Sequence, residues 1–224
     1  MRAVLFDVDG TLVLSNDAHA RAWVEAFAAY GHEIDYAQVR SMIGMGGDKI
    51  IPKLCPGLTD ERGEGKQIAA ARKAIFLERF APHLRPAPGA RELLLHLRSQ
   101  GLKLVVASSA QRDELSELLR AAAAQDLFDD AATSSDSEHS KPDPDVVRAA
   151  LKRSGAQAPE AFMVGDTPYD VSAARKAGLR IIAVRCGGWD DTELRGAEAV
   201  YEDPAQLLAA YDTSPLGKEV ARNL

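Results

Sequence analysis

The stretch Val4-Leu5-Phe6-Asp7-Val8-Asp9-Gly10-Thr11-Leu12-Val13 stands near the start of the chain and decides the fold. A short apolar run that ends in carboxylates is typical of a buried strand whose charges lie where it leaves the core. Side chains two apart on a strand share a face, so Asp7 and Asp9 can point into one space, and Gly10 allows a sharp turn beyond them. Two carboxylates there repel each other unless a divalent cation binds them, one is protonated, or both are solvated. A simpler interpretation is a sheet edge with an aspartate that caps the next helix.

The composition is that of an ordinary globular protein of 224 residues, 46% hydrophobic and 27% charged. This length suits one large domain, or a core domain with a smaller insertion. A net charge of -6 argues against a nucleic-acid partner, which would favour a basic surface. Cys55 and Cys186 lie too far apart in sequence to indicate a disulfide framework or a zinc site. No apolar run is long enough for a membrane span, so we expect a cytoplasmic protein. We also expect a monomer or weak homodimer.

Residues 14–84 show only helical patterns and turns, which predicts an inserted all-helical cap domain. Asn16 or Asp17 can cap its first helix, and further helices are expected around Ile50 and over 68–80. The prolines and glycine between 82 and 89 then break the chain as a domain boundary would. We therefore expect the core domain to comprise residues 1–13 and 85–212, and residues 213–224 to form a loosely ordered C-terminal tail.

After this boundary, helical and extended patterns alternate, which predicts a mainly parallel sheet with helices on both faces, a Rossmann-like α/β fold. The expected helices cover 91–99 and 112–123, one that begins at Pro144 after an Asp143 cap, and one that ends at Ala177; the expected strands cover 102–107, the neighbourhood of Ala131, 161–164 and 180–184. Ligands bind outside the carboxyl ends of the strands in such sheets. That rule places four polar groups on one rim: Asp7 with Asp9, Ser108, Lys141, and Asp166 with Asp170.

These four groups, in this order, resemble the motifs of the haloacid dehalogenase superfamily, and the resemblance covers nearly the whole chain. Asp7-Val8-Asp9-Gly10-Thr11 is similar to the first motif, and Leu104-Val105-Val106-Ala107-Ser108 to the second. Lys141-Pro142 resembles the third, and Gly165-Asp166 through Asp170 the fourth. The helical stretch 14–84 lies where one branch of the family carries a helical cap. That branch includes phosphoglycolate-phosphatase-like enzymes, sugar-phosphate phosphatases and beta-phosphoglucomutases.

The resemblance implies a Mg²⁺-dependent phosphatase that acts on a small phosphorylated metabolite through an aspartyl-phosphate. Asp7 would be the nucleophile, and Asp9 the general acid that then becomes the base. Mg²⁺ would be held by Asp7, the Asp9 backbone carbonyl and Asp166. A carboxylate nucleophile divides hydrolysis into two easier steps, and phosphoryl transfer needs mainly positioning and charge neutralisation.

Other residues receive supporting roles from the same resemblance. Ser108, with the Ser109 backbone amide, would bind phosphoryl oxygens, and Lys141 would neutralise charge on Asp7 and the phosphate. Asp170 would orient the metal ligands without binding the metal itself. Lys49, in a glycine-rich cap loop, can meet a second anionic group of the substrate or be a solvated lysine. For His19, near the cap hinge, packing or a hinge hydrogen bond is expected.

Several alternative functions have to be weighed against this one. A phosphosugar mutase uses the same two aspartates, a dehalogenase usually lacks the second, and a phosphonatase needs a cap lysine with a depressed pKa. A non-catalytic phosphate-binding protein is an alternative from another class. The sequence Ser108-Ser109-Ala110 slightly favours a sugar or polyol phosphate over phosphoglycolate.

Overall fold

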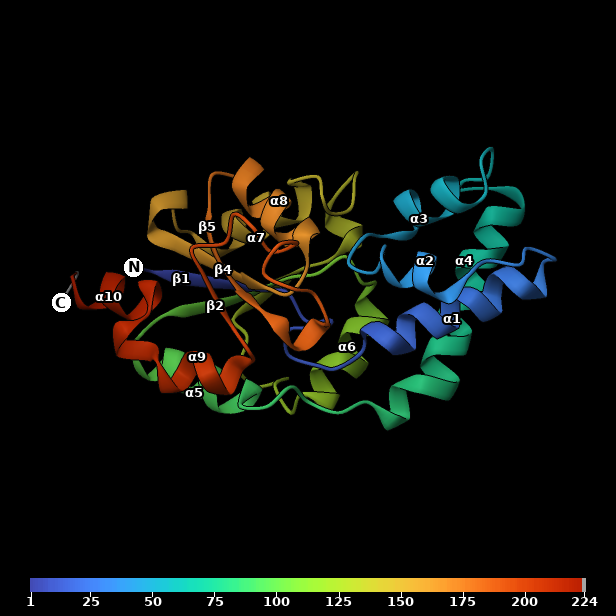
Figure 1. The fold of residues 1–224 in the computed structure, drawn as a ribbon. Helices are drawn as coiled ribbons and strands as arrows, with labels where there is room; N and C mark the ends of the chain where they lie inside the picture. Colours follow the sequence, from blue (N-terminus) through green and yellow to red (C-terminus); the bar gives the residue numbers. More distant parts are fainter. Residues whose placement is uncertain (223–224) are drawn as a thin grey trace.

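The computed structural model describes residues 1–222, and a six-stranded parallel sheet forms its centre (Figure 1). The strands are β1 (Ala3–Phe6), β2 (Lys103–Ala107), β3 (Asp130–Ala132), β4 (Ala161–Gly165), β5 (Arg180–Val184) and β6 (Ala199–Tyr201). Their order is β3-β2-β1-β4-β5-β6, and every neighbouring pair is parallel. All four residues of β1 are buried, as expected for a strand that is covered on both faces. The predicted Rossmann-like α/β fold is confirmed.

Helices cover both faces of this sheet and divide its core into two apolar layers. Val4 and Phe6 of β1 pack with α5 (Ala90–Ser99), α6 (Arg112–Ala121), α9 (Pro204–Ala209) and α10 (Pro215–Ala221). Ala3 and Leu5 point to the other face and pack with α7 (Asp145–Ser154) and α8 (Pro168–Lys176). This alternation follows from the two-residue period of a strand.

The cap consists of α1 (Asn16–Ala29), α2 (Tyr36–Arg40), α3 (Gly47–Leu54) and α4 (Gly63–Ile75), and a π-helical turn (Phe76–Phe80) extends the last of these. It has an apolar core of its own, in which Trp23 and Phe27 pack with Ile50, Ile51 and Ile68. Figure 1 shows the four helices at the end of the molecule opposite the two termini. We therefore propose residues 14–84 as the cap domain and 1–13 with 85–212 as the core domain.

The two connections between cap and core run side by side and are joined by hydrogen bonds. The Leu14 amide donates to the Arg85 carbonyl at 2.9 Å, and the Ala87 amide donates to the Leu12 carbonyl at 2.8 Å. Val13 and Pro86 form an antiparallel bridge between them. A hinge between the two domains would lie at this paired crossing, directly after the Asp7 and Asp9 segment.

Two sequence predictions need correction within the described residues. The tail is not loosely ordered, because residues 215–221 form α10, whose Leu216 and Val220 pack into the core; residues 223 and 224 lie outside the described range. Asp143 does not cap α7, which begins one residue later with Pro144 as its N-cap residue. Asp143 instead pairs with Lys49 of the cap.

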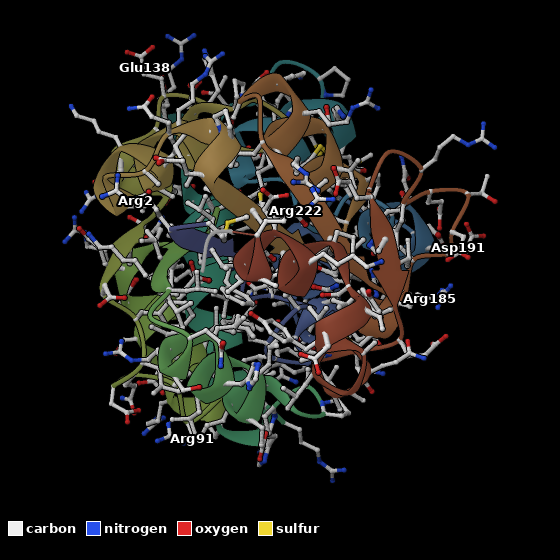
Figure 2. All side chains as sticks on the ribbon, turned by 90° about the vertical axis from the view of Figure 1, so that its left-hand side faces the viewer. Arg2, Arg91, Glu138, Arg185, Asp191 and Arg222 are labelled. Atoms are coloured by element: carbon white, nitrogen blue, oxygen red, sulfur yellow. The ribbon has the colours of Figure 1, made fainter. Side chains whose placement is uncertain are left out.

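Asp190 and Asp191 follow β5 and lie in a turn, where Asp190 accepts hydrogen bonds from two backbone amides. Asp191 pairs with Arg185, and both lie at the surface (Figure 2). The short strand β6 had no sequence signal, since its three residues are only partly buried. In residues 1–222, no helix has the length and apolarity to cross a membrane.

Candidate active site

The carboxyl ends of three adjacent strands bring the predicted polar groups together. Phe6 of β1 is in register with Val106 of β2 and with Val164 of β4. Asp7, Ser108 and Asp166 therefore emerge at the same edge, each within two residues of this common level. Parallel strands place such groups at one edge regardless of their separation in sequence.

Lys141 lies at the centre of this group and is almost completely buried. Its Nζ donates to Asp7 Oδ1 at 2.5 Å and lies 2.7 Å from Asp170 Oδ1. The other oxygen of Asp170 accepts hydrogen bonds from the Thr167 amide at 3.0 Å and from its hydroxyl at 2.7 Å. Asp170 is thus fixed through one oxygen by Thr167, and its other oxygen contacts the Lys141 ammonium.

Three buried carboxylates form a cluster here, and two of them, Asp7 and Asp170, contact Lys141. Oxygens of Asp7, Asp166 and Asp170 lie within 4.8 Å of one another. Burial raises the pKa of Asp7 to about 8, although Lys141 opposes the shift, and burial together with Asp170 and Asp7 raises the pKa of Asp166 well above its usual range. Burial would lower the pKa of Lys141, but Asp170 and Asp7 outweigh it and raise this pKa.

This donor set suits a divalent cation. Three ionised carboxylates and one ammonium carry a net charge of -2, which one divalent ion would neutralise. Carboxylate oxygens are the ligands that hard cations such as Mg²⁺ prefer. A bound cation would also remove the cause of the raised carboxyl pKa values, because it favours the ionised form.

Asp166 is held by two residues that were not predicted as site residues. The Thr11 hydroxyl donates to its Oδ1 at 3.1 Å, and the Asn16 amide group donates to its Oδ2 at 2.7 Å. Two glycines leave the room that this carboxylate needs: a Cβ on Gly187 would lie 1.7 Å from Asp166 Oδ2, and one on Gly10 2.1 Å from the same atom. The sequence indicated Asn16 only as a helix cap, since its contact is 150 residues away.

Asp9 points away from the carboxylate cluster and contacts the start of the cap. Its Oδ1 accepts from the Ser15 hydroxyl at 2.6 Å and lies 2.8 Å from His19 Nε2. Burial raises the pKa of Asp9, but His19 and Ser15 outweigh it, so the net pKa is lowered. The His19 ring stacks on Phe76, 3.9 Å between centroids. The expected packing and hinge hydrogen bond of His19 are thus both present.

Ser15 precedes α1 as its N-cap residue, yet its side chain makes no capping hydrogen bond. The hydroxyl serves Asp9 instead, and the next residue serves Asp166. Neither Asn16 nor Asp17 caps the helix, because Asn16 is the first helical residue and its amide points into the core. The first turn of the cap is therefore part of the site.

The two serines after β2 differ in position. Ser109 lines the cavity between cap and core, and its hydroxyl has no hydrogen-bond partner in residues 1–222. Ser108 is buried, and its oxygen accepts from the Ala110 amide at 3.1 Å. Lys49 does not line this cavity; its Nζ lies 2.7 Å from Asp143 Oδ2. This position gives no support to a substrate contact for Lys49.

Charged contacts hold the cap over the core. Arg72 of α4 forms an ion pair with the fully buried Glu114 of α6. The Arg72 guanidinium also lies 5.1 Å from the centre of the Trp23 ring. Arg40 of α2 donates to the Gly187 carbonyl at 2.5 Å. These pairs join residues that no local sequence pattern connects, so the sequence did not indicate them.

Fold and site together define an α/β enzyme with a carboxylate centre beneath a helical cap. Residues 4–184 match the family model described as haloacid dehalogenase-like hydrolase. The chain therefore belongs to the haloacid dehalogenase-like hydrolases, as the four motifs predicted.

Named relatives and solved structures agree with this family. The chain is 33% identical to a phosphoglycolate phosphatase of Rhodospirillum rubrum over 92% of its own length and 89% of that protein. It is 35% identical to the chloroplastic protein SUPPRESSOR OF QUENCHING 1 of Arabidopsis thaliana over 82% of its length, but spans only 18% of that longer protein. A crystal structure of a hydrolase from Pseudomonas syringae superimposes with a TM-score of 0.88 at 32% identity and covers 95% of this chain and 99% of that one.

Proposed function

We propose that this protein is a Mg²⁺-dependent phosphatase that hydrolyses a small phosphorylated metabolite through an aspartyl-phosphate on Asp7. The observation that carries the proposal is the buried group of Asp7, Lys141, Asp170 and Asp166 beneath a cavity that Asp7 and Asp9 line. The phosphatase name of the Rhodospirillum rubrum relative supports the same reaction class.

In the first half of the reaction, a carboxylate oxygen of Asp7 attacks phosphorus and the ester P–O bond breaks. Lys141 donates to Oδ1, which leaves the other oxygen of Asp7 available for attack. Asp9 gives its proton to the departing alkoxide. The pKa of Asp9 is lowered by His19 while no substrate is bound; an arriving phosphate dianion raises it again, because a nearby negative charge favours the protonated form.

In the second half, Asp9 accepts a proton from water, which attacks the phosphorus of the aspartyl-phosphate. The bond between phosphorus and Asp7 breaks, and inorganic phosphate and the free carboxylate result. Ser108, with the Ser109 backbone amide, binds phosphoryl oxygens, and Lys141 balances their charge. Closure of the cap excludes bulk water during these steps.

The residues present suit the proposed metal. Asp7 and Asp166, with the Asp9 backbone carbonyl, would hold Mg²⁺, and Asp170 would keep Lys141 in place beside them. When bound, the ion supplies positive charge that stabilises the phosphoryl group in its transition state.

Phosphate release from a panel of small phosphate esters, with Mg²⁺ and with excess EDTA, tests this function. We expect turnover that needs the metal, disappears in Asp7→Asn, and persists in the matched control Asp212→Asn, which lies exposed outside the cavity. Acid-quenched wild type should carry one phosphoryl group on the peptide that contains Asp7. Full activity in EDTA, or in Asp7→Asn, would show that the mechanism is wrong.

Two further outcomes identify the alternative functions. Conversion of glucose 1-phosphate to glucose 6-phosphate without release of phosphate would indicate a mutase. Binding of inorganic phosphate with no turnover of any ester would indicate a phosphate-binding protein.

A further inference from the structure

The cavity between cap and core has a volume of about 350 Å³ and opens above Asp7 and Asp9. Ligand pockets typically measure about 300 to 1,000 Å³, so this one suits a small metabolite. Its core side includes Ser109, whose hydroxyl has no partner in the described chain, and its cap side includes the buried ring of Trp23. A ligand in the cavity would thus lie between Ser109 on the core side and Trp23 on the cap side.

The charged residues around the cavity are almost all acidic. Beyond Asp7 and Asp9, the carboxylates that line it are Asp48, Asp60 and Glu61 from the cap and Glu114 and Glu138 from the core. Among the lining residues of the described chain, Arg72 is the only lysine or arginine, and Glu114 already neutralises it. Glu138 lies at the surface (Figure 2) and is one of the residues that line the cavity.

Apart from Arg72, which is paired with Glu114, the described cap residues that line the cavity include no lysine or arginine for a second anionic group. Asp48 accepts from the Ser140 amide at 3.1 Å, while the nearby Lys49 ammonium lies 3.8 Å from Asp48 and only 2.7 Å from Asp143, outside the cavity. Burial raises the pKa of Asp60, and the nearby charges of Asp48 and Glu61 add to this rise. Positive charge is concentrated instead at Lys141, where the transferred phosphoryl group would lie.

We propose that this cavity selects phosphate monoesters whose leaving group carries hydroxyl groups and no second anionic group. The inference rests on the phosphatase function proposed above and names its substrate class. Carboxylate oxygens accept hydrogen bonds from hydroxyls, whereas a carboxylate or second phosphate in the same place would repel them at low dielectric. Trp23, which is 3% exposed, adds a small apolar contact on the cap side for the carbon atoms of a polyol or sugar.

This selectivity would exclude phosphoglycolate, the substrate that the name of the Rhodospirillum rubrum relative gives. Phosphoglycolate carries a carboxylate two bonds from its ester oxygen, and that carboxylate would enter the space between Asp9 and the acidic cap wall. The cavity therefore favours a sugar or polyol phosphate over phosphoglycolate.

Two matched pairs of substrates test the inference in the intact protein with Mg²⁺. Glycerol 3-phosphate and 3-phosphoglycerate differ only in a hydroxymethyl or carboxylate group, and glucose 1-phosphate and glucose 1,6-bisphosphate differ only in a second phosphate. We expect kcat/KM to be at least about tenfold higher for the less charged member of each pair, since like charges in a closed site cost this much or more. Equal or reversed ratios would overturn the inference.

Removal of one cap charge shows whether these carboxylates cause the preference. Asp60→Asn should raise kcat/KM for the more anionic member of each pair, and so narrow both kcat/KM ratios about threefold or more. If Asp60→Asn folds poorly, Glu61→Gln, at an exposed position, should change the ratios in the same direction. Glu92→Gln removes the same charge from the exposed side of α5, away from the cavity, and should leave both ratios unchanged. Ratios that stay the same in both cap variants would contradict the assignment.

The two levels of the proposal fail in different ways. Turnover of the esters with no preference refutes the selectivity alone. Silence towards every ester, with p-nitrophenyl phosphate included, refutes the phosphatase function and the selectivity with it.

Discussion

Replacement of Lys141 by methionine tests the central electrostatic feature of the site. The substitution keeps a long, unbranched side chain but removes the ammonium that lies 2.5 Å from Asp7 and 2.7 Å from Asp170. The side chain is 1% exposed, so water cannot replace the lost charge. Three carboxylates within 4.8 Å of one another would then have no buried cation between them in the metal-free protein.

The expected loss of stability follows from the burial of the pair. Removal of one partner of a buried ion pair costs about 3–5 kcal/mol, because the other partner is left buried and uncompensated. For a chain of this size, about 2–4 °C of Tm corresponds to each kcal/mol, so Lys141→Met should lower Tm by about 6–20 °C. Lys49→Met is the matched control, since its side chain is 26% exposed and its pair with Asp143 should contribute at most about 1 kcal/mol.

The pH dependence of this loss has a defined sign. The pKa of Asp7 is about 8 and that of Asp166 is raised in the folded protein, whereas an unfolded aspartate titrates near 3.9. Between these values the folded state binds protons that the unfolded state does not, so metal-free stability rises as the pH falls from about 8 towards 4. Without the Lys141 ammonium, protonation stabilises the carboxylate cluster still more. The difference in Tm between Lys141→Met and wild type should therefore narrow as the pH falls.

Thermal unfolding in EDTA at pH 8 and pH 5 measures the loss of Tm and its dependence on pH. The same measurement with added Mg²⁺ gives the stabilisation by the ion. The ion should raise the Tm of Lys141→Met more than that of wild type, because it meets a cluster with one more negative charge. A Tm loss at pH 8 under about 3 °C, or no larger than that of Lys49→Met, would refute the idea that the ammonium compensates these carboxylates.

Three further perturbations address single contacts of the site. Gly187→Ala would place a methyl carbon 1.7 Å from Asp166 Oδ2, so this carboxylate must move, and we expect Mg²⁺-dependent kcat/KM to fall about 100-fold. His19→Ala removes a group that lowers the pKa of Asp9, so the pKa rises and the alkaline limb of the kcat profile should shift to higher pH. Because the pKa of Asp7 is about 8 without metal, Mg²⁺ should displace a proton and bind more tightly as the pH rises towards 8, as calorimetry in two buffers would show.

Each of these expectations has an outcome that contradicts it. Gly31→Ala is the control for Gly187→Ala: its φ of +83° strains the backbone of an alanine, but nothing lies within 4 Å of the new methyl group, so it reports a loss of stability alone and should retain Mg²⁺-dependent activity. Wild-type kinetics in Gly187→Ala would show that Asp166 does not depend on this space. If the alkaline limb of the kcat profile does not move in His19→Ala, His19 does not set the pKa of Asp9. If Mg²⁺ affinity is independent of pH, Asp7 does not lose a proton when the ion binds.

Much of the fold and the core of the site could be predicted from the sequence, because both depend on local patterns. The apolar run before Asp7 and the alternation of helix and strand after residue 85 reflect the burial of each element on a sheet, which composition and period reveal. Once the sheet is parallel, its topology places Asp7, Ser108 and Asp166 at one edge without further information. The four motifs carried the family for the same reason.

Contacts between distant segments could be decided only by the tertiary structure. Asn16 looked like a helix cap, yet its amide holds Asp166, 150 residues away; Lys49 looked available to the substrate, yet it pairs with Asp143. The sequence also could not place Asp60 on the cavity wall or bury Glu114 against Arg72. A side chain's partners depend on which helices pack together, and this packing follows from apolar surfaces far apart in the chain. The sequence by itself therefore determined the fold and the polar groups that meet at the edge of the sheet, while the charge of the cavity above them came only from the packing of cap on core.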